Sequence, residues 1–155
     1  MNRLWIGLED NPLAERTVLI AAPPPGADSL AEIIRTKKGF PLQCNTPEEL
    51  FSSMEFGEPD FLILFEGFGS EDSGSNPVLE YIQTMPTNQR REIFVAWVGQ
   101  GVKVGDRLAA FALGVNLVLP PQNLPDIAKR ITNSWMEWKH LYQAYFQSRK
   151  DIIGY

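Results

Sequence analysis

Apolar residues along this chain gather in five short runs, and the stretches between them repeat their apolar positions at helical spacing. The central run, residues 59–68, starts with a Pro-Asp turn, continues as an unbroken apolar stretch and ends in Glu66 and a glycine-rich loop. Such a run between turn residues, with helical patterns on both sides, predicts a strand buried on both faces of a parallel sheet. Four similar runs predict further strands over residues 17–22, 40–45, 93–98 and 115–121.

Five helices are predicted from capping residues and apolar stripes. Ser29 and Glu32 have the spacing of a capping box, which predicts a first helix over residues 29–38 with the three prolines at 23–25 outside it. A polar turn is expected over residues 86–92. The other helices are predicted to begin at Thr46, Asn76, Asp106 and about Leu124, and the last to continue to about Arg149.

Strands that alternate with helices of this length predict an α/β fold, a three-layer sandwich in which helices cover both faces of a parallel sheet. No GxGxxG follows the first strand, so we expect the flavodoxin-like strand order 2-1-3-4-5 and not a dinucleotide-binding domain. The predicted organisation is an N-terminal arm (1–16), the α/β domain (17–132), and an extension of the last helix with a tail (133–155). In such sheets the chemistry sits at the carboxyl ends of the strands.

Composition and charge argue against several classes of function. The 155 residues fit one domain, and a net charge of −5 disfavours sequence-independent binding to nucleic acid. No apolar run is long enough for a membrane span, and the first residues do not resemble a signal peptide, so we expect a cytoplasmic protein. The single cysteine, Cys44, is expected to face the core, and with one histidine, His140, no metal site or cofactor is expected.

Aromatic residues are concentrated in the last helix, which outruns what is needed to cover a five-stranded sheet. Their spacings of three and four form a heptad-like seam. Two interpretations stay open: the seam anchors a homodimer, or the arm residues Trp5, Ile6 and Leu8 cover it within one chain. The residues of this expected interaction surface are Trp135, Trp138, Tyr142 and Tyr145.

Over residues 17–132 the chain resembles the receiver domain of two-component response regulators. The resemblance lies in PDFLILF around the third strand, and in LAAFALGVNLVLPP and NLPDIAKRI near the C-terminal end of the domain. It implies an acidic pair after the first strand that holds Mg²⁺, and a phosphoryl-accepting aspartate at the end of the third. It also implies a Ser or Thr after the fourth strand and a Lys after the fifth.

None of these residues is found at the corresponding positions. The acidic pair falls on Ala22, Pro23 and Pro24, the aspartate on Phe65, the Ser or Thr on Gly99, and the lysine near Pro120 and Pro121. The resemblance therefore implies a pseudo-receiver, a non-catalytic signalling or scaffold module that acts through protein contacts. In receivers these contacts commonly use the fourth and fifth helices and fifth strand, here expected to include Ala109, Ala110 and Leu119.

Two other functions are compatible with the sequence. The glycine-rich loops at the same edge could bind a small ligand or nucleotide, with Ser70, Gly99, Gly101 and Lys103 among the contacts. Alternatively, phosphorylation in a phosphorelay survives through Glu66, one residue past the expected aspartate; strand alternation points Glu66 away from the position of Phe65.

Overall fold

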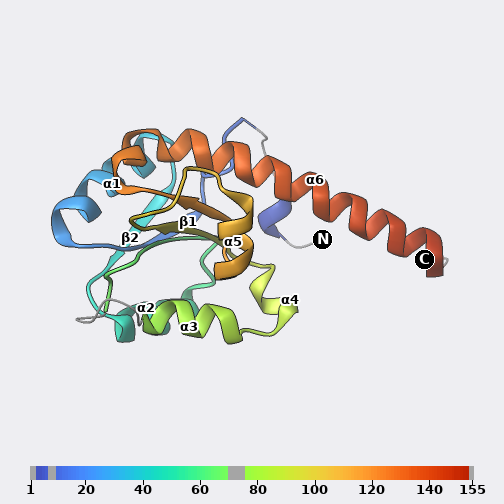
Figure 1. Ribbon diagram of the computed structural model, residues 1–155, viewed down its shortest axis with the longest axis horizontal. Coiled ribbons are helices and arrows are strands. Elements are labelled where there is room, and N and C mark those ends of the chain that lie inside the picture. The colour runs from blue at the N-terminus through green and yellow to red at the C-terminus, as the bar shows by residue number, and fades with distance from the viewer. Residues whose placement is uncertain (1–2, 7–9, 70–75, 154–155) are drawn as a thin grey trace.

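The computed structural model describes residues 3–6, 10–69 and 76–153, which form a five-stranded parallel sheet between two layers of helices (Figure 1). The strand order is β2-β1-β3-β4-β5, so the predicted flavodoxin-like topology is confirmed. The strands are β1 (Thr17–Ala21), β2 (Phe40–Cys44), β3 (Phe61–Phe65), β4 (Phe94–Val98) and β5 (Leu117–Leu119).

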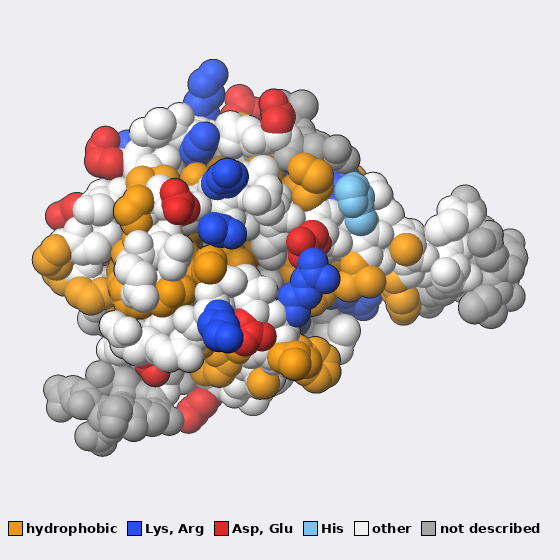
Figure 2. Space-filling view, turned by 45° about the horizontal axis from the view of Figure 1, so that its top comes forward, with side chains coloured by type: hydrophobic (Ala, Val, Ile, Leu, Met, Phe, Trp, Pro, Cys, Tyr) orange, Lys and Arg blue, Asp and Glu red, His pale blue; other side chains and the backbone are white. Residues whose placement is uncertain are grey.

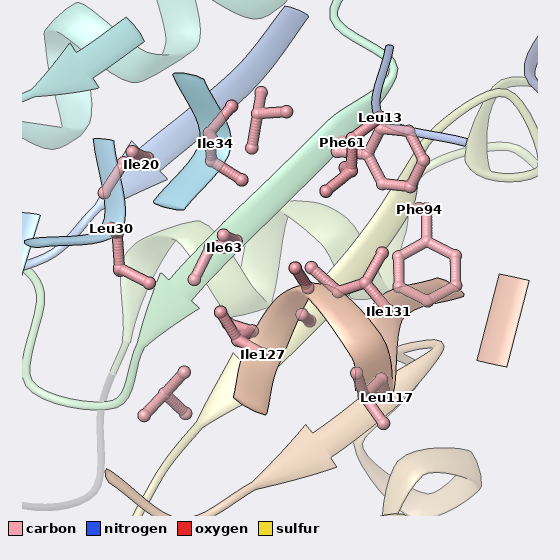
Figure 3. Close-up of a cluster of buried hydrophobic side chains, with 14 of the residues drawn as sticks. Leu13, Ile20, Leu30, Ile34, Phe61, Ile63, Phe94, Leu117, Ile127 and Ile131 are labelled. Carbon is pink, nitrogen blue, oxygen red and sulfur yellow. The ribbon is translucent and has the colours of Figure 1, made fainter. Parts of the chain in front are cut away.

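Side chains that alternate along the strands divide the core into two clusters. Val18 and Ile20 of β1 face one side, where α1 and α6 pack, and Leu19 and Ala21 face α2, α3 and α5. Figure 3 shows the first cluster, with Ile127 and Ile131 of α6 over the sheet. The helical segments are η1 (Arg3–Trp5), α1 (Pro24–Thr36), α2 (Pro47–Gly57), α3 (Pro77–Thr84), α4 (Thr87–Arg90), α5 (Arg107–Leu113), η2 (Pro121–Asp126) and α6 (Ile127–Ile153).

The start of the first helix was predicted wrongly. Helix α1 begins at Pro24 and not at Ser29, because a proline in the first turn lacks only an N–H that would have no partner inside the helix. The first turn of the helix is closed by a hydrogen bond in which the N–H of Ala27 donates to the carbonyl of Pro23 at 2.8 Å. Ser29 lies within the helix, and its hydroxyl donates to the carbonyl of Pro25.

Local signals placed the starts of three other helices correctly. The side chain of Thr46 accepts from the N–H of Glu49, and Asp106 accepts from the N–H groups of Leu108 and Ala109. Asn76 caps α3 in the same way. Residues 87–90 form the short helix α4 inside the predicted polar turn, and α6 continues past the predicted end to Ile153.

The N-terminal residues pack against α6. Trp5 is buried, its ring stacks on that of Trp135 with centroids 6.4 Å apart, and it lies 4.9 Å from the ring centroid of Tyr142. Arg16 donates to the carbonyls of Leu4 and Ile6 and so holds this segment beside β1. Among the described residues, no helix has the length and apolar character needed to cross a bilayer.

Candidate functional site

The residues predicted at the edge of the sheet are brought together by the strand register. Ala21 pairs with Leu64 across β1 and β3, and Phe65 pairs with Val98 across β3 and β4. Val98 in turn pairs with Leu119 of β5. The carboxyl ends of these four strands therefore lie side by side, and the residues at or just past them are Ala22, Pro23, Phe65, Gly99 and Pro120.

The five positions that correspond to the receiver's site residues hold no side chain that can ionise. Ala22 and Pro120 are buried, Pro23 precedes α1 as its exposed N-cap, and Phe65 is half-buried between the two core clusters. A Cβ built on Gly26 of α1 would lie 3.7 Å from the Phe65 ring, so the ring packs near the start of that helix. Mg²⁺ requires carboxylate, carbonyl or water oxygens. These side chains offer none, and the positions do not fit the metal site that a receiver resemblance implies.

Glu66 is exposed at the same edge, and its carboxylate has a structural partner. The Oε2 atom accepts a hydrogen bond from the main-chain N–H of Gln100 at 3.1 Å. The N–H of Glu66 donates to the carbonyl of Val98 at 2.9 Å. Glu66 thus connects the end of β3 to the loop that follows β4.

Asn76 forms hydrogen bonds at the same edge of the sheet, on the side of α3. Its Nδ2 donates to the carbonyls of Phe65 and Glu66, at 3.2 and 2.9 Å, while its Oδ1 accepts from the first N–H groups of α3. One amide therefore joins the end of β3 to the beginning of α3. Ser70, the fourth residue of the predicted ligand set, lies outside the described residues.

The three described members of that ligand set lie in the turn after β4. Gly99 is buried, and a Cβ on it would come within 2.7 Å of the Trp97 indole nitrogen, so close packing requires a glycine there. Gly101 has a φ of 78°, which favours glycine in a tight turn. Lys103 is exposed. Within the described residues, no three His, Cys, Asp or Glu side chains are grouped so that they could hold a metal ion.

The aromatic seam of α6 is largely used inside the chain. Trp135 is fully buried and donates to the carbonyl of Leu4 at 2.9 Å, so the structure removes it from the expected interaction surface. Trp138 is half-buried and donates to the carbonyl of Asn116, and Tyr142 is half-buried against Trp5. Tyr145 remains 48% exposed. Of the arm residues, Trp5 covers the seam, Ile6 points to solvent and Leu8 is outside the described residues.

The expected surface on α5 and β5 also needs correction. Ala110 and Leu119 are buried, because the alanine-rich face of α5 lies close against the sheet. The large side chains of that helix point outward instead: Leu108 is 82% and Phe111 86% exposed. Their spacing of three residues was a signal for one shared face that the sequence analysis did not use.

A second apolar surface lies around the middle of α6, where Leu141 is 57% exposed. In Figure 2 hydrophobic side chains reach the surface near the pale blue histidine and along the part that projects to one side. This surface was not predicted as a site, because the predicted seam followed Trp138, Tyr142 and Tyr145 and left out Leu141.

Comparisons with solved structures agree with the fold described above. A receiver domain protein (CheY-like) from Methanospirillum hungatei is 14% identical, with a TM-score of 0.60, over 80% of this chain and 95% of that one. The fold is that of a response regulator receiver domain. The receiver domain of a Francisella response regulator is 9% identical, with a TM-score of 0.62, over 79% and 98% of the two chains.

A third similar structure extends further along this receiver-like chain. It is a fusion protein that contains the trimeric coiled coil of yeast Spc42, is 13% identical with a TM-score of 0.63, and covers 92% of this chain and 88% of its own. At the level of sequence, no family model and no curated protein matches. At these identities the likeness concerns the fold.

Proposed function

We propose that this chain is a non-catalytic signalling module, a receiver-like domain that has lost the phosphorylation site and acts by binding other proteins. One observation carries the proposal. The edge at which this fold collects its chemistry is occupied by Ala22, Phe65, Gly99 and Pro120, which include no nucleophile and no metal ligand.

Phosphoryl transfer to a carboxylate depends on positioning and on neutralising the phosphoryl oxygens, usually with a metal ion and a fixed cation. A phenyl ring at the end of β3 accepts no phosphoryl group. The nearest carboxylate along the chain, that of Glu66, accepts from the N–H of Gln100. A phosphorelay through Glu66 would receive neither a metal ligand nor a fixed cation from the side chains of Ala22, Phe65, Gly99 and Pro120.

Contacts with another protein have candidate surfaces in the exposed apolar residues of α5 and α6. We expect the module to act in the cytoplasm. Self-association through α6 is a second candidate, because the similarity to the coiled-coil fusion covers 92% of this chain, against 79% and 80% for the two receiver domains. Tyr145 and Leu141 are the exposed residues that such a contact would use.

The test of lost phosphorylation is incubation with acetyl phosphate and Mg²⁺, followed by intact-mass measurement, with a competent receiver domain treated in parallel. We expect no phosphoryl adduct on this chain and no change in its amide spectra with beryllofluoride. An adduct that disappears in Glu66→Gln would overturn the proposal in favour of a phosphorelay.

Two further measurements separate the remaining alternatives. Light scattering over a concentration series reports self-association, and a monomer at the highest concentration excludes the homodimer. Calorimetric titration with a panel of nucleotides and metabolites tests the ligand alternative, which requires binding heat that falls in Lys103→Ala.

A further inference from the structure

A groove with a volume of about 700 Å³ lies at the end of the molecule opposite the edge described above. Its walls come from the end of α3, from α4, from the last turn of α5 and from α6. The segments 87–91 and 111–114 directly precede β4 and β5, so the groove opens beside the amino ends of these two strands. The residues used below are Met85, Arg90, Arg91, Phe111, Leu141 and Tyr145.

The groove is apolar with a positive wall. Among the described residues that line it there are two arginines, Arg90 and Arg91, and no Asp or Glu. The Arg91 guanidinium lies 5.9 Å from the ring centroid of Tyr145, so one charge sits beside an exposed aromatic ring. Met85 and Leu141 supply flexible apolar contacts next to it.

Arg90 is fixed before any partner arrives. It donates to the carbonyls of Gly114 and Ile93 and to Oδ1 of Asn116, at distances of 2.8 to 3.1 Å. All three acceptors are neutral, so these hydrogen bonds orient the guanidinium without cancelling its charge. Burial lowers the pKa of Arg90 to about 10, and the group therefore stays protonated at neutral pH.

Charge is unevenly distributed along the chain. Helix α6 carries five Lys and Arg against two Asp and Glu, although the whole chain has a net charge of −5. A second α6 laid in this groove would bring like charges together. An acidic ligand would instead be attracted by the positive charge of the two arginines.

We propose that this groove is the docking site for an acidic amphipathic helix of a partner protein. The apolar face of that helix would cover Met85, Leu141 and Tyr145, as amphipathic helices generally fill grooves between helices. Its flanking Asp or Glu side chains would face Arg90 and Arg91. This inference rests on the proposed function, since it names the partner chemistry of a module that acts by protein contacts.

The experiment uses a fluorescein-labelled synthetic helix with Leu on one face and Glu on its flanks, and a matched peptide in which every Glu is Lys. Fluorescence anisotropy with the full chain is expected to show saturable binding of the Glu peptide alone. Leu141→Asp and Arg91→Gln should each weaken binding by about tenfold, as for residues at the centre of an interface. Lys129→Gln is the matched control: it removes one exposed positive charge from α6 outside the groove, and should leave binding unchanged.

Several results would overturn the proposal. These are no saturation with the Glu peptide, equal binding of the Lys peptide, or the same loss in Lys129→Gln as in Arg91→Gln. Self-association that Leu141→Asp abolishes, with no peptide binding, would assign the groove to a second copy. Binding to phosphatidylglycerol vesicles through the same residues would assign it to a membrane surface. None of these results depends on phosphoryl uptake, so failure here is distinguishable from failure of the proposed function.

Discussion

The indole of Trp5 stacks on the indole of Trp135, with ring centroids 6.4 Å apart and planes inclined by 18°. Each nitrogen is paired as well: Trp5 donates to the carbonyl of Arg91 at 2.8 Å, and Trp135 donates to the carbonyl of Leu4 at 2.9 Å. The arm and α6 are thus joined by both apolar contact and hydrogen bonds, which is the combination that buried tryptophans favour.

Trp5→Ala is expected to lower the free energy of unfolding by about 3 kcal/mol, because it opens a cavity beside Trp135 and removes one hydrogen bond. Urea denaturation followed by circular dichroism measures the change. Ile6→Ala is the matched control, since Ile6 is 57% exposed and should cost less than about 0.5 kcal/mol. Equal stability of the two variants would mean that the arm does not pack as described.

Asn116 is the second structural centre for which a substitution is informative. Its Oδ1 accepts from Val95 N–H and from Arg90, both at 2.8 Å, and its carbonyl accepts from Ser134 and Trp138. Asn116→Leu leaves the first two donors without this acceptor and should cost about 3 kcal/mol of unfolding free energy. Asn116→Asp keeps the acceptor and gives Arg90 a charged partner, so thermal unfolding should place it closer to wild type. A Leu variant as stable as wild type would contradict this account.

A substitution at Gly99 tests whether this glycine is required for packing, which the alternative of a ligand-binding loop does not predict. In Gly99→Ala the new Cβ would lie 2.7 Å from the Trp97 indole nitrogen and 3.2 Å from the Glu66 carboxylate. Overpacking of this kind should cost about 2 kcal/mol, measured as a lower urea midpoint at unchanged slope. Gly67→Ala is the control, because no atom lies within 4 Å of its Cβ position. An unchanged midpoint in Gly99→Ala would show that space, and not packing, surrounds this residue.

Cys44 should react slowly with alkylating reagents in the folded chain. Burial is the main cause that raises the pKa of the thiol above 9.0, against an opposing hydrogen bond with Ser53. The folded thiol therefore stays protonated to higher pH than a free cysteine, and at pH 8 it provides less of the reactive thiolate.

The measurement is the iodoacetamide reaction rate from pH 7 to 10, with urea-unfolded protein as the control. Because the folded state holds the proton more tightly than the unfolded state, this group's contribution to stability is complete below pH 9 and decreases as the pH rises above it. A native rate equal to that of the unfolded chain at pH 8 would contradict the burial of Cys44.

The fold was predictable because its signals are local. Buried parallel strands appear as continuous apolar runs, and Thr46, Asn76 and Asp106 each cap a helix within three residues of themselves. The prolines at 23–25 misled the prediction because proline excludes a helix interior but not a helix start. Prolines that precede a helix and prolines that form its first turn give the same sequence pattern, so the pattern alone does not place the helix start.

The site was predictable only in part. The residues at the strand ends follow from strand order, and Ala22, Phe65, Gly99 and Pro120 lie at one edge of the sheet. The packing of Trp5 on the seam at Trp135 is one of the two interpretations that the sequence left open, because no spacing rule connects residues so far apart along the chain. The groove was not predicted at all, because Arg90 and Leu141 belong to elements whose packing is decided by tertiary structure.

Helix α6 runs without interruption from Ile127 in the core to Ile153, a length of about 40 Å at 1.5 Å per residue. Because the helix is continuous, the buried Trp135 fixes the direction in which each side chain of the projecting half points. A single residue inserted between Trp138 and Leu141 would turn everything beyond it by about 100° and take Tyr145 away from Arg91. The side of α6 on which its distal side chains lie is therefore set by the number of residues that separate them from Trp135 as much as by their chemistry.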